Sequence, residues 1–129
     1  MTIAEVGRKS GMTPDTLRYY ERMGLIPPVH RTQSGLRDFT EGDMRWVEFV
    51  RCMRAAGVTI ETLAEYVALF RGGAATVQAR KKLLEDQREQ IAQRIAEQQA
   101  ALERLDYKLD GYEERMVAQC ESRLKITPD

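Results

Sequence analysis

The longest uninterrupted segment of the chain constrains its fold more than any other feature. Residues 74–119 contain no proline and one glycine, Gly111. From position 84 to 116, sites spaced alternately by four and three residues are apolar in eight of ten cases. This pattern is typical of a helix with one apolar stripe. Such a helix would be about 67 Å long. A partner chain in a coiled coil is therefore favoured over a fold-back of the helix onto the rest of the same chain.

The apolar side chains of this pattern, called here the apolar stripe, form the predicted dimer interface. They are Leu84, Ile91, Ile95, Leu102, Leu105, Leu109, Tyr112 and Met116. The predicted organisation has three parts: a compact domain over residues 1–73, a dimerisation coiled-coil helix over 74–119, and a short C-terminal tail over 120–129.

Threonine and glycine punctuate the first 73 residues. A threonine precedes each helix-like stretch, at Thr2, Thr13, Thr40 and Thr59, and a glycine follows each, at Gly11, Gly24, Gly57 and Gly72. Threonine caps the free N–H groups of a first turn, and glycine adopts the left-handed conformation that ends a helix. Thr2 with Glu5 also predicts a capping box. We expect helices over 3–10, 14–23, 41–56 and 60–70.

The first two predicted helices are joined only by residues 11–13, which is typical of a helix-turn-helix. On the second helix, Leu17 and Tyr20 share one side. The opposite side carries polar residues spaced by three and four, namely Asp15, Arg18, Tyr19 and Arg22. A helix with such a polar face fits a DNA major groove, so residues 14–23 are the candidate recognition helix.

Residues 28–39 are expected to form a small β-hairpin, or wing. Pro27 and Pro28 disfavour a helix before it, and Ser34-Gly35 between two short extended runs predicts a turn. Arg31 and Arg37 lie on the two arms, where they would reach backbone phosphates. The predicted fold class is therefore all-α with a small β-wing: a winged helix-turn-helix domain followed by a long coiled-coil helix.

Charge supports a nucleic-acid surface only through its distribution, because the formal net charge is zero. The segment from Arg8 to Arg37 contains six basic and two acidic residues, whereas the segment from Asp38 to Phe70 contains six acidic residues and three arginines. A local basic patch on a neutral protein fits a nucleic-acid partner. Chance clustering on a solvated face is the alternative.

The composition argues against a metal-binding protein, an enzyme and a membrane protein. The two cysteines, Cys52 and Cys120, are far apart, and His30 is the only histidine. This inventory predicts no metal site, no catalytic residues and no cofactor, and so no enzyme. No apolar run approaches the ~20 residues of a membrane-spanning helix, so we expect a soluble cytoplasmic protein without a membrane partner.

The segments "TLRYYERMGLIPP" and "RTQSGLRDFT" resemble the MerR family of bacterial transcription regulators. The resemblance covers residues 3–70, with one departure at Leu36, where an aromatic residue is common. It implies a homodimer held by an antiparallel coiled coil on a two-fold promoter operator with an overlong spacer. Effector binding would then distort the DNA so that RNA polymerase engages the promoter. An architectural or recombination-directionality factor is the alternative, but such proteins usually lack a long dimerisation helix.

The resemblance also implies which residues contact DNA. They are Arg18, Tyr19 and Tyr20 of the recognition helix and Arg31 and Arg37 of the wing. Thr13 and Thr16, at the start of the same helix, complete the predicted DNA-binding set.

The branches of the family differ in the effector they sense and in the residues they need for it, which limits the effectors expected here. Metal and iron–sulfur sensors carry cysteines that are missing here, and the multidrug branch has a large C-terminal ligand domain. The chain resembles the short branch that responds to aldehydes and other electrophiles, in which Cys52 is the sensor candidate. Arg45 and Arg51 lie near it, and cationic neighbours favour a thiolate. The alternative is an inert, packed thiol. Cys120 is expected to be a surface thiol.

Overall fold

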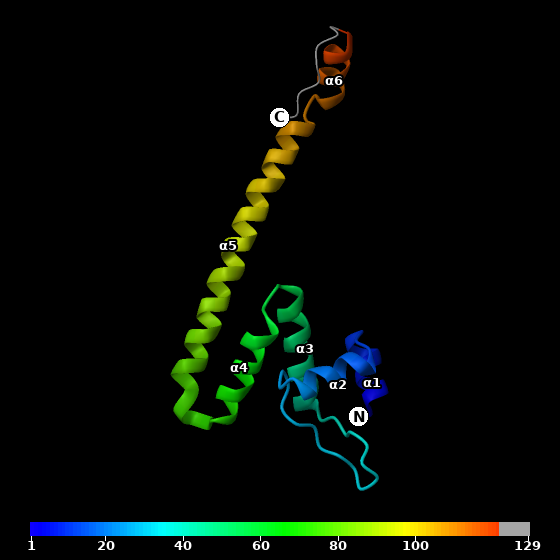
Figure 1. Ribbon diagram of the computed structural model, residues 1–129, viewed down its shortest axis with the longest axis vertical. Coiled ribbons are helices and arrows are strands. Elements are labelled where there is room, and N and C mark those ends of the chain that lie inside the picture. The colour runs from blue at the N-terminus through cyan, green and yellow to red at the C-terminus, as the bar shows by residue number, and fades with distance from the viewer. Residues whose placement is uncertain (122–129) are drawn as a thin grey trace. The chain divides into compact units, whose positions relative to one another are not determined.

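The computed structural model describes residues 1–121, and its elements are almost all helical (Figure 1). They are α1 (Ile3–Ser10), α2 (Pro14–Arg22), α3 (Glu41–Ala55), α4 (Ile60–Arg71), the 3₁₀ turn η1 (Gly73–Thr76), α5 (Val77–Leu109) and α6 (Tyr112–Glu121). The predicted fold class is confirmed, and the four helices of the first domain match their predicted ranges to within one residue. The part of the predicted tail beyond Glu121 lies outside the described residues.

The threonine caps form as predicted. Each hydroxyl accepts a hydrogen bond from the backbone N–H three residues on, at Thr2, Thr13, Thr40 and Thr59. The complete capping box, with its reciprocal pair of bonds, occurs at Thr40 and Asp43 and not at the predicted Thr2 and Glu5. Each cap satisfies a donor that the first helical turn leaves free, which is worth about 1 kcal/mol.

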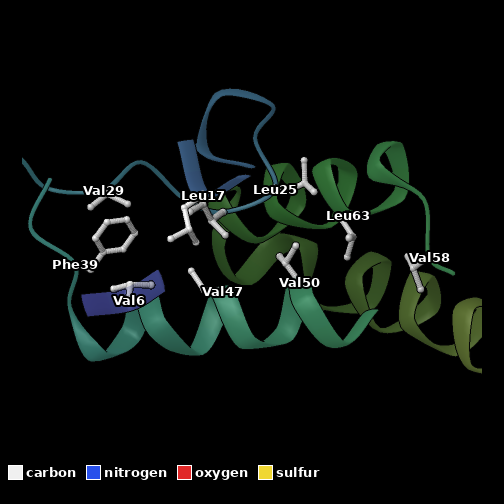
Figure 2. Packing of buried hydrophobic residues seen from close by; sticks show 10 residues of the cluster. Val6, Leu17, Leu25, Val29, Phe39, Val47, Val50, Val58 and Leu63 are labelled. Atoms are coloured by element: carbon white, nitrogen blue, oxygen red, sulfur yellow. The ribbon is translucent and has the colours of Figure 1, made fainter. Parts of the chain in front are cut away.

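A single hydrophobic core joins α1 to α4 with the segment between α2 and α3. Figure 2 shows side chains from all of these elements converging on it. Helix α2 contributes Leu17, and α3 contributes Val47 and Val50, all nearly inaccessible to solvent. Val6 of α1 and Leu63 of α4 join them, and the loops add Leu25, Val29, Phe39 and Val58. Each such burial stabilises the fold by about 1.5–3 kcal/mol, so the core holds the polar face of α2 in a fixed orientation.

The single helix predicted over residues 74–119 is not continuous. Helix α5 ends at Leu109 and α6 begins at Tyr112, because Gly111 adopts a left-handed conformation with φ of 66°. Tyr112 and Met116 therefore lie on a different helix from the rest of the apolar stripe. Glycine enters this conformation without the steric cost that other residues incur, so the prediction failed at the one glycine it contained.

The chain divides into two compact units between Ile91 and Ala92. The first holds α1 to α4 and the start of α5, and Ile91 packs against its core. In the second, the stripe residues of α5 keep half or more of their surface exposed: Ile95 61%, Leu102 51%, Leu105 59% and Leu109 64%. Residues 92–121 thus leave half or more of each of these four side chains uncovered. No helix of the described chain is long and apolar enough to traverse a lipid bilayer.

Candidate nucleic-acid interface

Helix α2 presents a polar face while its apolar side anchors it. Leu17 is buried, and Tyr20 packs partly against the core. On the other side Arg18 is exposed, and its guanidinium donates to the Asp15 carboxylate at 2.8 Å. Arg22 lies over the ring of Tyr19, with Cζ 5.6 Å from the ring centroid. This face thus carries two exposed guanidinium groups beside an aromatic ring, a combination suited to phosphates and base edges.

The start of α2 brings together the two predicted threonines. Thr13 accepts from the Thr16 N–H at 3.1 Å, and the two hydroxyls lie 2.9 Å apart. Pro14 occupies the first turn, where its missing N–H costs nothing. The positive end of the α2 dipole is therefore at Thr13, and such helix N-termini bind phosphate groups readily.

The predicted wing is a short hairpin between α2 and α3. Arg31 and Arg37 pair as an isolated antiparallel bridge. Above them, the Gly35 N–H donates to the Thr32 carbonyl at 2.9 Å, and the Leu36 carbonyl accepts from the Thr32 N–H at 2.7 Å. Gly35 has a φ of 85°, a conformation that explains the glycine in the predicted turn. Arg31 is exposed and donates to the Gly35 carbonyl at 3.0 Å.

Glu21, which the sequence analysis did not select, connects the wing to α2. One carboxylate oxygen accepts from the Arg37 Nε at 2.6 Å, and the other accepts from the Val29 N–H at 2.7 Å. The side chains of Glu21 and Arg37 are only 14% and 19% exposed. Arg37 thus points inward to the recognition helix, whereas Arg31 remains on the surface. The sequence clue that could have identified Glu21 is its position, four residues after Leu17 on the apolar side of α2, with Arg37 16 residues later as a possible partner.

The pKa of the Glu21 carboxyl reflects competing effects. Burial alone would raise this pKa, because the charged form loses hydration. The hydrogen bond from Val29 and the bond and charge of Arg37, with a smaller contribution from Arg31, outweigh burial and lower the pKa below its usual value. Glu21 is therefore ionised at neutral pH and holds the base of the wing.

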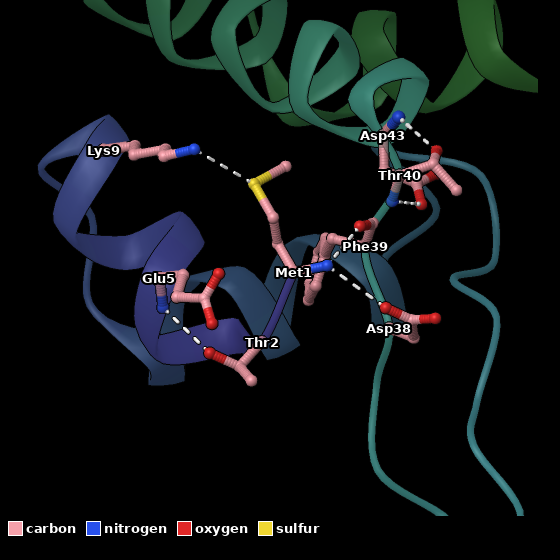
Figure 3. Close-up of polar contacts among 8 residues, drawn as sticks. All are labelled: Met1, Thr2, Glu5, Lys9, Asp38, Phe39, Thr40 and Asp43. Carbon is pink, nitrogen blue, oxygen red and sulfur yellow. Dashed lines mark hydrogen bonds and ion pairs between the residues drawn. The ribbon is translucent and has the colours of Figure 1, made fainter.

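The returning arm of the wing is also held at its far end. Figure 3 shows the Met1 amino group donating to the Asp38 carboxylate at 3.1 Å and to the Phe39 carbonyl at 2.7 Å. Lys9 of α1 in turn contacts the Met1 sulfur at 3.4 Å. Directly after Phe39, Thr40 caps α3. These contacts join the wing to α1 and α3, so that wing and recognition helix belong to the same compact unit.

Cys52 lies on the surface of α3 and has a free thiol. The neighbouring Arg51 is engaged by the Glu48 carboxylate at 2.9 and 3.1 Å. The single chain thus presents an accessible thiol, as a sensor would require. The side chain of Cys120 lies outside the part that the structure describes. Among residues 1–121, no three His, Cys, Asp or Glu side chains are grouped so as to hold a metal ion.

Comparison with known proteins agrees with this geometry. A family model described as "MerR HTH family regulatory protein" matches residues 1–69. A second model, "MerR, DNA binding", matches residues 44–107. The chain belongs to the MerR family. It is accordingly a DNA-binding transcriptional regulator, as its winged helix-turn-helix predicted.

Individual members of the family are similar over most of this chain. The transcriptional regulator AdhR of Bacillus subtilis is 55% identical over 91 residues, which cover 70% of this chain and 65% of AdhR. A MerR family regulator from Listeria monocytogenes is 49% identical, with a TM-score of 0.86 over 95% of this chain and 92% of that one. HiNmlR, a MerR family regulator that lacks the sensor domain, was solved bound to promoter DNA. It is 31% identical, with a TM-score of 0.82 over 90% of this chain and 92% of HiNmlR.

Proposed function

We propose that this regulator binds a two-fold symmetric operator in a promoter spacer as a homodimer and activates transcription by distorting the DNA when it senses an effector. Residues 1–73 bind the DNA, and the apolar stripe within residues 74–119 pairs with a second copy through an antiparallel coiled coil. RNA polymerase acts at the same promoter, in the cytoplasm. The alternative architectural role has no specific observation in its favour.

The observation that carries the proposal is the connection of α2 and the wing through Glu21. Because both elements are held on one core, they would engage one stretch of duplex together, α2 in the major groove and the wing beside the backbone. The predicted contacts are Thr13, Thr16, Arg18, Tyr19, Tyr20, Arg31 and Arg37. Distorting a promoter costs on the order of several kcal/mol, and phosphate contacts from the wings of two copies would offset part of that cost.

Selection of binding sites from a randomised duplex pool tests this function. Wild-type protein is expected to enrich a two-fold symmetric sequence. Arg18→Ala should reduce the discrimination between selected and random duplexes, because Arg18 lies on the groove-facing side of α2. Arg31→Ala should weaken binding to all duplexes similarly and lower the salt dependence by about one released ion, because Arg31 stays exposed on the wing. Enrichment of no symmetric site by the wild type would contradict the proposal.

The effector is proposed to be an electrophile or another small molecule, with Cys52 as the sensor candidate. Its support is the exposed thiol on α3 and the similarity to AdhR. With an aldehyde, the Cys52 sulfur would bond to the carbonyl carbon as the carbon–oxygen π bond opens, and the oxygen would take up the proton that the thiol releases, giving a hemithioacetal. The adduct would alter how the DNA-binding domain sits against the long helix and hence the spacing of the two recognition helices.

A further inference from the structure

An aromatic pocket lies between α3 and α4, apart from the proposed DNA contacts. It has a volume of about 350 Å³ and is lined by four rings, Trp46, Phe49, Tyr66 and Phe70, together with Gly42 and Arg45. The Trp46 ring meets the Phe70 ring edge-on at 5.1 Å and lies 5.8 Å from the Tyr66 ring. Phe70 nevertheless remains 43% exposed. The volume falls within the range of small-molecule sites, near its lower end.

The charges at this pocket are positive. Arg45 is exposed at its rim and, within residues 1–121, makes no ion pair or hydrogen bond. The Arg45 guanidinium lies beside Gly42, 3.7 Å from where a Cβ on that glycine would stand. Arg80 stacks on Phe70 with Cζ 4.9 Å from the ring centroid, and its buried Nε has no partner among the described residues.

We propose that this pocket binds a small aromatic carboxylate, with its ring against the open side of the four aromatic side chains and its carboxylate on Arg45. Rings in a protein gain about 0.5–1.5 kcal/mol from offset or edge-on contacts beyond burial. A cationic ligand, which aromatic cages also bind, is disfavoured because Arg80 already occupies the exposed side of Phe70 and Arg45 would repel it. An uncharged aromatic ligand would leave Arg45 unpaired.

Occupancy of the pocket would bear on regulation, and this consequence rests on the proposed function. The ligand would contact α3 through Trp46 and Phe49 and α4 through Tyr66 and Phe70. It would thus fix these helices against each other, next to the start of α5. Cys52 follows Phe49 by three residues on the same helix, so the pocket also lies about one turn from the candidate sensor. The non-covalent ligand and the electrophile would therefore act on the same element.

Trp46 makes the test direct, because it is the only tryptophan in the chain. Benzoate is titrated into the full-length protein while Trp46 emission is recorded, with N-acetyltryptophanamide correcting for absorption by benzoate. We expect a saturable change. Cyclohexanecarboxylate should bind several-fold more weakly, because it lacks the ring quadrupole, and benzyl alcohol about tenfold more weakly, because it lacks the charge.

Two arginine variants assign the carboxylate contact. Arg45→Gln should lower the affinity for benzoate about tenfold. Arg51→Gln is the matched control on the same helix, since Glu48 already engages Arg51, and it should leave benzoate binding unchanged. Phe70→Leu should also weaken benzoate, and Cys52→Ala should not.

Three results would overturn the inference. One is a linear, unsaturated response to benzoate, and another is equal loss of binding in Arg45→Gln and Arg51→Gln. The third is a wavelength of maximum Trp46 emission that shifts with protein concentration but not with benzoate. That result would assign the aromatic face to a second copy of the chain. Site selection from the duplex pool is independent of these titrations, so failure of the pocket would leave the DNA-binding proposal intact, and the reverse also holds.

Discussion

At the scale of single residues, Glu21 determines how the wing is held. Replacing it with glutamine keeps a neutral acceptor for the Val29 N–H but leaves the partly buried Arg37 without its counter-charge. We expect Glu21→Gln to lower the free energy of unfolding by about 1–2 kcal/mol, measured by urea denaturation at neutral pH. Glu48→Gln is the control, because its exposed pair with Arg51 should contribute close to nothing. Equal losses in both variants would refute the role of Glu21.

The pH dependence follows from the lowered pKa of Glu21. A carboxyl whose folded pKa lies below its unfolded value stabilises the fold above the unfolded pKa. That contribution is lost as the pH falls through the folded pKa. The advantage of wild type over Glu21→Gln should therefore be full at neutral pH and disappear in acid. A constant difference in urea midpoint between pH 7 and acid would contradict this assignment.

Cys52 is tested by separating binding from induction. Cys52→Ala should keep its affinity for the selected operator, since the thiol lies outside the predicted contact set. It should lose transcriptional induction by an electrophile such as an aldehyde, because no adduct can form. Mass spectrometry of the treated protein identifies the modified residue, and Cys120→Ala serves as the control that retains induction. Normal induction in Cys52→Ala would leave a non-covalent ligand as the signal.

The residue-level predictions worked where a property depends on near neighbours in the chain. Leu17 on the buried side of α2 and Arg18 on its exposed side follow from helical periodicity alone. The inward turn of Arg37 does not, because it depends on a carboxylate 16 residues earlier that only the folded chain brings within 2.6 Å. The aromatic pocket was missed for the same reason, since its rings come from two helices.

At the scale of elements, Gly7 shows a requirement of the helix-turn-helix that its sequence pattern did not reveal. Gly7 is buried in α1, and a Cβ there would lie 2.8 Å from the Met12 carbonyl oxygen. Gly7→Ala should therefore force the turn between α1 and α2 apart and cost about 1–3 kcal/mol. Thermal unfolding and operator affinity measure the effect.

Gly42→Ala is the matched comparison for Gly7→Ala. Gly42 also lies within a helix, but its added Cβ would meet neighbours at ordinary distances of 3.5 and 3.7 Å. Alanine in a helix is favoured over glycine by about 0.5–1 kcal/mol, so Gly42→Ala should be neutral or stabilising. If Gly7→Ala proved equally harmless, α1 and α2 would not need this close approach.

Element boundaries were predictable wherever capping chemistry is local. The threonine hydroxyls at Thr13 and Thr59 each bond within one turn of the helix they begin, so short-range pattern is sufficient. The break at Gly111 was not predicted because the apolar period continues through it to Met116. Periodicity records which side chains could share a face, but a left-handed glycine between them ends the helix regardless.

At the scale of the whole molecule, the apolar stripe needs a second chain. Leu102, Leu105 and Leu109 are more than half exposed in the second unit. An aligned apolar surface of this kind marks an interaction site. A two-fold dimer would present two copies of α2, and two-fold operators are matched by dimers whose half-sites lie about one helical turn of DNA apart or a multiple of it. Dimerisation and operator recognition are thus expected to depend on each other.

Leu105→Glu tests that dependence. A charge placed in the stripe would be buried without a partner if the coiled coil formed, at a cost of several kcal/mol. We therefore expect a shift to monomer in sedimentation and loss of operator binding in the same variant. Ala100→Glu adds the same charge to the opposite side of α5, five residues earlier, and should leave both properties unchanged. The far-UV circular dichroism of the first domain should be kept in both variants, because its core lies within residues 1–91. Wild-type protein that sediments as a monomer at micromolar concentration would refute the dimer, and a monomeric Leu105→Glu that still bound the operator with full affinity would refute the coupling.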